Sequence, residues 1–396
     1  MIYIIAFLMN ITTGLVLLSN PLVALDRFHA NALMLGILGS GPAIVYALGC
    51  AGGGFWTDRI GFRKMIILAG VIVFLSFSSI FLVDSFRHLI FLTMAAALGA
   101  SFFWPAMIRW LGEEGQGDRL RIRVGNYNIA LIGGVMVGPL VAGLLISTDF
   151  RLPYLISAGL IIVILVILRA GKEKASAGEG GAAPAVSLGE EEEKSVPGFI
   201  YIGWAANFAA WFAIGGSQAL FPKLAQDLPA VIGDQFLGIL FSLIAGGEIA
   251  VFLILRKTSR WHYNYRFLLL FQLLGIGGLV ILALNSHPAL FILAFLGIGF
   301  AGGMTYFSSI FYSIHKQDAK GRKSGFHESF LGLGVALGPI TGGLAVSEFG
   351  LRAPYILAIA VFVVSIVFQI WILKKWKVEE NDETRMRNDE RIPKPE

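Results

Sequence analysis

The sequence predicts an all-α membrane protein whose twelve transmembrane helices form two parallel six-helix halves related by pseudo-two-fold symmetry. Two observations predict this fold: a composition too apolar for a water-soluble chain, and a sequence that repeats after about 200 residues. Of the 396 residues, 56% are hydrophobic and 14% are charged, whereas soluble domains carry about 25% charged residues. Most of the surface of this chain must therefore face lipid.

The apolar residues are grouped into segments of membrane-spanning length. A helix needs about 20 mainly apolar residues to cross a hydrocarbon core of about 30 Å. The single cysteine, Cys50, lies inside the second segment and excludes an internal disulfide. The twelve predicted spans are 2–22, 32–53, 65–83, 88–111, 124–146, 152–169, 198–220, 235–256, 266–284, 289–312, 326–346 and 352–373.

The basic residues predict the orientation of these spans. Lysine and arginine are enriched in cytoplasmic loops of membrane proteins. All but five of the 31 lysines and arginines follow even-numbered segments or lie in the C-terminal tail. We therefore expect a multi-pass protein of the cell membrane with both termini in the cytoplasm and no deep basic side chain. The exceptions, on the opposite side, are Arg27, Arg87, Arg151, Lys223 and Arg352.

An internal repeat divides the chain into two copies of one six-helix unit. GGVMVGPLVAGLL at 133–145 recurs as LGVALGPITGGLA at 333–345, and LGILGS at 35–40 recurs as LGILFS at 237–242. A stretch rich in Gly, Ala and Glu between the copies reads as a flexible linker. The expected organisation is an N-terminal bundle at 1–170, a cytoplasmic linker at 171–197, a C-terminal bundle at 198–377 and a charged, disordered cytoplasmic tail at 378–396.

A charged stretch, GFWTDRIGFRK, joins the second and third segments. A tight loop needs a residue that tolerates positive φ, and Gly61 supplies it. Asp58 ends the second segment, where it can face the positive dipole end of the eleventh segment near Gly325. The residues of this candidate cytoplasmic gate are Gly54, Asp58, Arg59, Gly61, Arg63 and Lys64.

The spacing Gly-x-x-x-Asp-Arg-x-Gly-x-Arg-Lys, placed between two parallel halves, resembles the major facilitator superfamily (MFS) of transporters over nearly the whole chain. The resemblance implies alternating access about a central site, with a charge clasp that closes the cytoplasmic side and favours the outward-open state. The alternative is a solvated loop that only fixes topology. The second half has Arg260 and Tyr263 at the positions of Asp58 and Gly61. A charge clasp is therefore expected only from the loop of the first half.

Two helices carry the same glycine-proline pattern. Proline removes a backbone hydrogen bond and bends a helix, and glycine lets a neighbouring helix approach closely. In the fifth segment this pattern resembles the antiporter motif of the drug/proton antiporter-like branch, which favours export. Close packing is the alternative, because Ala142 departs from the usual glycine and the eleventh segment repeats the pattern. The residues are Gly134, Gly138, Pro139, Gly143, Gly334, Gly338, Pro339 and Gly343.

Three ionisable residues inside predicted spans are candidates for proton coupling. Ionisable groups in a membrane are costly and are usually functional. Glu248 is the deepest, and burial disfavours its charged form, which suits reversible protonation. A carboxyl that faces a watery vestibule or a polar neighbour is the alternative. His327 and Glu328 open the eleventh segment. They suit either gating, in which Glu328 interacts with the helix dipole or pairs with Arg59 or Arg63, or proton transfer.

Two absences argue against a standard proton antiporter. The first segment has no acidic residue, and Ala95 stands where the resemblance predicts a proton-relay arginine. If protons drive this chain, the relay is therefore of another kind.

The resemblance places a substrate cavity among segments one, four, seven and ten. Aromatic residues at helical spacing also serve packing, whereas an amide in mid-membrane needs a partner. The absence of a deep Lys or Arg argues against strongly anionic cargo. An aromatic cavity with amides suits a neutral or cationic amphipathic molecule. The candidate substrate-binding residues are Asn10, Trp104, Asn207, Trp211, Gln218, Tyr306 and Ser309.

The sequence therefore predicts a secondary active transporter that exports a small compound, with proton exchange as the coupling that Glu248 would provide. Two alternatives stay open: uptake of a small neutral solute such as a sugar, and a non-transporting sensor or assembly factor with the same fold. We expect no enzyme activity, cofactor, metal or nucleic-acid partner. The expected partners are a small-molecule substrate, the lipid bilayer and protons, with the chain acting as a monomer.

Overall fold

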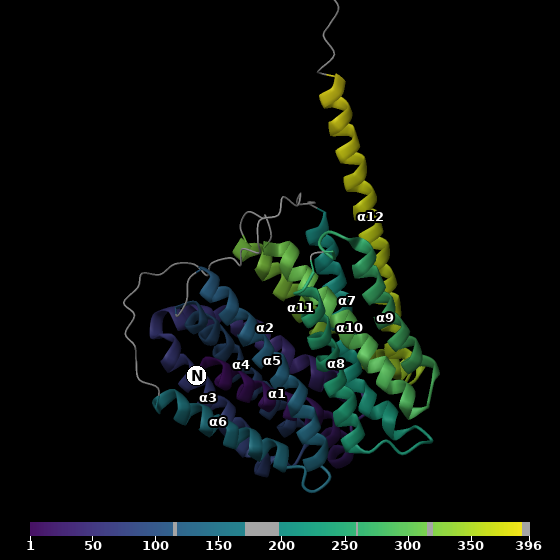
Figure 1. Ribbon diagram of the computed structural model, residues 1–396. Coiled ribbons are helices and arrows are strands. Elements are labelled where there is room, and N and C mark those ends of the chain that lie inside the picture. The colour runs from purple at the N-terminus through teal and green to yellow at the C-terminus, as the bar shows by residue number, and fades with distance from the viewer. Residues whose placement is uncertain (114–116, 171–197, 259, 315–319, 390–396) are drawn as a thin grey trace, which may run out of the picture.

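The computed structural model describes residues 1–113, 117–170, 198–258, 260–314 and 320–389 (Figure 1). Twelve α-helices in these ranges are long and apolar enough to cross a membrane. Each predicted span corresponds to one of them, which confirms the predicted fold class. The helices are α1 (Ile2–Phe28), α2 (Ala32–Ile60), α3 (Phe62–Ser78), α4 (Phe86–Glu113), α5 (Gly117–Leu145), α6 (Leu152–Ala170), α7 (Phe199–Gln226), α8 (Asp234–Leu255), α9 (Tyr265–Leu284), α10 (Pro288–Ile314), α11 (Lys320–Phe349) and α12 (Ala353–Asp389).

Local sequence signals set several helix ends. Asn31 caps α2, where its side-chain oxygen accepts a hydrogen bond from the Met34 N–H at 2.9 Å, as short polar residues commonly do at this position. Gly61, with φ of 90°, is the single residue between α2 and α3. This positive φ is the reason the tight turn requires glycine. Asn264 caps α9 by accepting from the Arg266 N–H at 3.2 Å.

The last helix extends beyond the length that the composition predicts. Residues 378–396 were expected to form a disordered tail, but α12 continues to Asp389. The stretch 378–389 contains Glu, Arg and Met, which favour helices, and no glycine or proline. Nothing in the local sequence therefore ends the helix where the membrane-spanning part ends. Figure 1 shows this extension projecting from the bundle.

The two halves are built alike and meet at two helix crossings. Figure 1 shows α1–α6, in purple to blue, beside α7–α12, in teal to yellow. Within the halves, α1 packs on α5 and α7 packs on α11. Between the halves, α2 packs on α11 and α5 packs on α8. These pairings are symmetric, because the helix that is fifth in one half always meets the helix that is second in the other.

At each of these crossings, one of the two repeated motifs lies on one helix and the other motif lies on the facing helix. Gly36 on α2 lies against the carbonyl of Pro339 on α11, and a β-carbon at Gly36 would fall 2.6 Å from that oxygen. Gly238 on α8 lies in the same way against the carbonyl of Pro139 on α5. The LGIL motif of each half therefore receives the Gly-Pro motif of the other. The Ser40 hydroxyl also donates to the Ala336 carbonyl.

Both crossings lie toward the membrane side that is opposite to the basic loops, which we call the predicted outer side. At the same side Gln226 Nε2 on α7 donates to Asp26 Oδ1 on α1 at 2.9 Å, joining the halves again. Toward the predicted cytoplasmic side, Glu328 lies within a membrane-spanning helix but has a side chain that is 61% exposed. The halves are thus closed at the predicted outer side and apart at the predicted cytoplasmic side.

A buried amide pair, which the sequence does not reveal, joins α9 to α12. Gln272 and Gln369 each donate to the other's side-chain oxygen, at 3.0 and 2.9 Å, and Gln369 also donates to Ser365 at 2.8 Å. All these groups are buried. The reciprocal bonds satisfy two amides that would otherwise be costly in lipid.

We predict that Gly238→Leu displaces the population toward the outward-open state, because the leucine side chain would collide with the Pro139 carbonyl. Overpacking costs about 1–3 kcal/mol, enough to raise a minor state about tenfold. Labelling of Ile146→Cys by a membrane-impermeant maleimide, in a Cys50→Ser background, measures this opening. The matched control is Gly277→Leu on α9, where an added β-carbon meets nothing within 4 Å. Equal labelling of both variants would contradict the role of the crossing.

Candidate functional site

The gate residues lie at the end of α2 and the start of α3, and those of their contacts that can be described here are with the N-terminal half. Asp58 Oδ1 accepts from Arg109 Nη1 of α4 at 3.0 Å, and its side chain is 78% exposed. Arg109 also donates to the Thr57 carbonyl at 2.8 Å. Arg59 lies over the ring of Phe55, at 4.2 Å from the centroid. Asp58 thus pairs with α4 in this conformation and not with α11.

The remaining gate residues are placed in the same region. Arg63 donates to the Leu168 carbonyl of α6 at 3.3 Å, so it ties α3 to the end of that helix. Lys64 is exposed. Gly54 lies on α2, and its surroundings fall outside the described part of the chain. Because the halves are apart at this end, the predicted clasp to α11 stays a prediction for the opposite conformation.

The glycines of the two glycine-proline helices pack against helices of their own half and of the other half. Gly134 and Gly138 of α5 pack on α1, where Gly138 meets Gly14. Gly334 and Gly338 of α11 pack in the same way on α7, against Phe208 and Phe212. The last glycine of each pattern faces the other half: Gly143 meets Asp234 of α8, and Gly343 meets Ala32 of α2.

Glu248 occupies a notch between α8 and α10. A β-carbon at Gly302 of α10 would fall 2.9 Å from Glu248 Oε1, and one at Gly303 would fall 2.9 Å from the Glu248 Cα. Two adjacent glycines therefore make the space that the carboxyl fills. Among the described residues the carboxyl has no hydrogen-bond partner, and its charge interacts with the phenol of Tyr306. Glu248 is half-buried in this notch, and a carboxyl that is partly removed from water without a partner is costly when ionised.

His327 and Glu328 differ sharply in their surroundings although they are neighbours. The His327 side chain is fully buried, and its Nδ1 is 2.8 Å from the Ser309 hydroxyl. Its Nε2 has no hydrogen-bond partner and lies 3.7 Å from Glu328 Oε1. The His327 ring packs edge-on against Tyr306, with centroids 5.0 Å apart. One helix therefore places an imidazole inside the C-terminal half and a carboxylate at its surface.

Among the predicted substrate residues of α7 and α10, Trp211 and Tyr306 are in ring contact, and Asn207 lies one turn before Trp211 on the same helix. Asn207 is fully buried, and neither its amide nitrogen nor its oxygen has a partner. One turn further along α7, the Trp211 ring faces Tyr306 at 6.4 Å, and its indole N–H is also without a partner. Phe252 of α8 packs on the other side of Tyr306 at 6.0 Å. Unpaired polar atoms beside rings are what a ligand could satisfy.

The other substrate candidates do not join these three residues. Asn10 is buried on α1 close to Gly134, and Trp104 packs edge-on against Phe103 on α4, at 5.1 Å. Gln218 lies farther along α7 and is partly exposed. Within the described residues, no hydrogen bond or ring contact links these three side chains to Tyr306.

Sequence reasoning missed Tyr46, Cys50 and Tyr127, which lie near Glu328 or Tyr306. The charge of Glu328 interacts with Tyr46 and Cys50 of α2, and Tyr127 of α5 interacts with Tyr46 and Tyr306. They were missed because the cavity was expected between segments one, four, seven and ten. The available signal was a phenol inside each of two apolar spans, Tyr46 in the second and Tyr127 near the start of the fifth.

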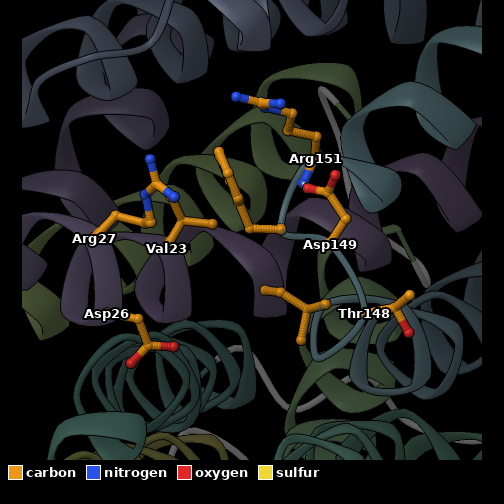
Figure 2. A pocket seen from close by; sticks show the side chains of 8 residues that line it. Val23, Asp26, Arg27, Thr148, Asp149 and Arg151 are labelled. Atoms are coloured by element: carbon orange, nitrogen blue, oxygen red, sulfur yellow. The ribbon is translucent and has the colours of Figure 1, made fainter.

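A separate cavity of about 430 Å³ lies on the predicted outer side (Figure 2). It is bounded by the end of α1 and by the α5–α6 turn, with Arg27 4.4 Å above the Phe150 ring. Asp149 accepts from the Arg151 backbone N–H at 2.9 Å, and in Figure 2 the Arg151 guanidinium is directed away from this carboxylate. Because Asp26 of this lining also bonds across the halves, the cavity belongs to the outer closure.

Comparisons with known proteins agree with this architecture. The Major Facilitator Superfamily model matches residues 2–322 and 267–394. Multidrug resistance protein 1 of Bacillus subtilis is 23% identical over 382 residues, covering 92% of this chain and 93% of that protein. The uncharacterized MFS-type transporter YuxJ of Bacillus subtilis is 24% identical, covering 81% of this chain and 84% of the relative.

Solved structures with the same fold are also transporters. A bacterial homolog of the human lysosomal transporter Spinster, in an inward-facing and unoccupied conformation, superposes with a TM-score of 0.74 at 16% identity over 95% of both chains. The nucleoside transporter NupG gives a TM-score of 0.70 at 13% identity, covering 94% of this chain and 98% of that one. The family match spans nearly the whole sequence, and the chain therefore belongs to the major facilitator superfamily of membrane transporters.

Proposed function

We propose that this transporter exports a small neutral or cationic amphipathic compound from the cytoplasm in exchange for protons. The observation that carries the proposal is Glu248, a carboxyl inside the C-terminal half that has no hydrogen-bond partner among the described residues. Such a group is stable when protonated and costly when charged. It can therefore couple a proton to the conformation that exposes it.

The arrangement of the halves supports alternating access. With the basic loops in the cytoplasm and both termini on that side of the cell membrane, this conformation is inward-open. Transport then requires the two glycine crossings to separate and the predicted cytoplasmic ends to close. In that second state Asp58 would exchange the Arg109 contact for the N-terminal end of α11, where the helix dipole favours a negative charge.

A proton path within the C-terminal half replaces the relay arginine that is absent at Ala95. Glu328 is exposed to the predicted cytoplasmic side, His327 Nε2 lies 3.7 Å from it, and the ring of His327 contacts Tyr306. Tyr306 in turn interacts with Glu248. The order Glu328, His327, Tyr306, Glu248 leads from the open side to the half-buried carboxyl, with Ser309 orienting the imidazole.

The substrate would bind beside this path, on the wall formed by Asn207, Trp211 and Tyr306. The two partnerless side chains on α7 provide hydrogen-bond donors and an acceptor, and the rings provide apolar contact. A polar group of the substrate would satisfy the Asn207 amide, and a hydrogen bond made there is stronger in a dry site than in water.

We predict that Glu248→Gln abolishes proton-driven transport but retains substrate exchange, because glutamine keeps the shape of the side chain and cannot release a proton. Purified protein in liposomes, with a dye or drug as substrate, measures accumulation under a pH gradient and counterflow without one. Asp84→Asn, which alters an exposed acid, is the matched control. Unchanged accumulation in the Glu248 variant would remove it from coupling.

We predict that Asp58→Asn increases labelling of cytoplasm-facing cysteines, because it removes the charge that favours the clasped state. Asp58 is largely exposed, so its pair with Arg109 contributes little to stability, and the variant should fold. Arg109→Gln is the comparison variant. It removes the partner that Asp58 has in this conformation and keeps the charge of Asp58. If both variants label alike, Asp58 works through Arg109 and the clasp to α11 is wrong.

In a host that lacks its own exporters, the chain should lower the accumulation of lipophilic dyes and drugs. Collapse of the proton gradient should restore accumulation, and Glu248→Gln should behave as the empty host. If the accumulation of every dye and drug in a broad panel is unchanged while sugars or small metabolites accumulate, the chain is an importer. No movement of either class would favour the sensor or assembly role.

A further inference from the structure

Two arginines line the cavity on the predicted outer side that Figure 2 shows. Arg27 lies in the last turn of α1, and Arg151 directly precedes α6. Their guanidinium carbons lie 4.4 and 5.1 Å from the centroid of one ring, that of Phe150. Two positive charges are therefore held close to a single aromatic side chain at the edge of one cavity.

Neither guanidinium has an acceptor among the described residues. Within that part of the chain, no hydrogen bond or ion pair joins the side chain of Arg27 or Arg151 to another residue. The Nε atom of Arg151 is also buried, and a buried donor without an acceptor is costly. Because arginine stays protonated in proteins, the two side chains repel each other as well. An anion placed between them would relieve both costs.

The internal repeat offers a comparison for one of these arginines. RLPY in the first half recurs as RAPY in the second, so Arg352 corresponds to Arg151. Arg352 uses its terminal nitrogens to cap the end of α9. The acceptors, at 3.2, 2.7 and 2.7 Å, are the carbonyls of Leu282 and Asn285 and the hydroxyl of Ser286. Arg151 instead lies over the Phe81 ring, 5.3 Å from its centroid. The arginine that has a structural role in one half therefore keeps unused donors in the other.

The two acidic residues of the lining are engaged elsewhere. Asp26 accepts from Gln226 across the halves, and Asp149 accepts from the Arg151 backbone N–H, each at 2.9 Å. In the described part of the chain, neither carboxylate forms an ion pair with an arginine of the cavity. The two acids nevertheless balance the formal charge of the lining. This balance favours a ligand with a single anionic group over a polyanion.

A phosphate group matches these donors in geometry and size. Guanidinium presents a planar fork of N–H donors that fits the oxygens of phosphate in a bidentate manner. Phosphate has oxygens on all sides and can accept from two such forks, while the exposed hydroxyl of Thr148 in the lining offers a third donor. The cavity volume of about 430 Å³ lies within the range of about 300–1,000 Å³ that small-molecule sites occupy.

We propose that Arg27 and Arg151, with Thr148, form a binding site for a single phosphate group on the predicted outer side of the protein. The site is separate from the substrate residues of α7 and α10, and the inference does not depend on the proposed export. A soluble phosphate ester and the headgroup of an outer-leaflet phospholipid present the same chemistry to these residues. The experiment therefore includes one arm for each source.

The test measures binding to the full chain in a phosphate-free detergent, with two pairs of probes that differ only in the phosphate. Glycerol 3-phosphate and glycerol are titrated calorimetrically, and phosphatidic acid and diacylglycerol are compared by native mass spectrometry. The wild type should bind at least one phosphate probe and neither phosphate-free one. Arg27→Gln and Arg151→Gln should each weaken that binding about tenfold or more. The matched control is Arg87→Gln, which removes an exposed arginine from the same side and should bind as the wild type does.

The outcomes separate the two sources and decide the proposal. Arginine-dependent binding of glycerol 3-phosphate supports a soluble ligand, and the same dependence for phosphatidic acid alone supports a lipid headgroup. Absence of binding of both phosphate probes to the wild type, wild-type affinity in either arginine variant, or an equal loss in Arg87→Gln would overturn the site. Because Arg27 is exposed at the end of a helix, its variant should fold, and an unchanged thermal midpoint would verify this. Arg151→Lys, which keeps the charge without the fork, should recover only part of the affinity.

Discussion

The close approach of helix backbones at two crossings between the halves is the constraint on which the rest of this structure depends. Gly36 meets Pro339, and Gly238 meets Pro139, at distances that no larger side chain allows. With little hydrophobic force between helices inside a lipid bilayer, such packing is a main source of association. Closure at the predicted outer side in turn leaves the other side open, which is why Glu328 lies exposed inside a membrane span.

The two halves share one architecture but divide the chemistry. Both present a glycine-proline helix to the other half, so the mechanical parts are duplicated. The carboxyl in its glycine notch, the imidazole and the partnerless amide all lie in the C-terminal half, on α7, α8, α10 and α11. The N-terminal half contributes Tyr46 and Tyr127 and the charged loop. This division supports a proton path and a ligand wall that move as one body against a less polar partner.

Particular residues show which features of the structure could be predicted from the sequence. The spans, the turn at Gly61 and the resemblance to the family follow from local composition and spacing, because a bilayer requires apolar helices of fixed length. The depth of Glu248 was evident for the same reason. Arg109 as the partner of Asp58, and Tyr46 as a neighbour of Glu328, were not predictable, since each contact joins helices that are distant in sequence. Gln272 and Gln369 were overlooked because a buried amide has no local signature.

The sequence by itself determined the twelve helices, their expected orientation and the duplication of the unit, since these depend on hydrophobic length, charge placement and internal repetition. Only the tertiary structure decided which motifs face one another, that Asp58 is engaged within its own half, and that Glu328 opens toward space while its neighbour His327 is buried. The physical reason is that these features depend on how two bodies pack, and the packing at the glycine crossings also selects the conformation in which they are seen.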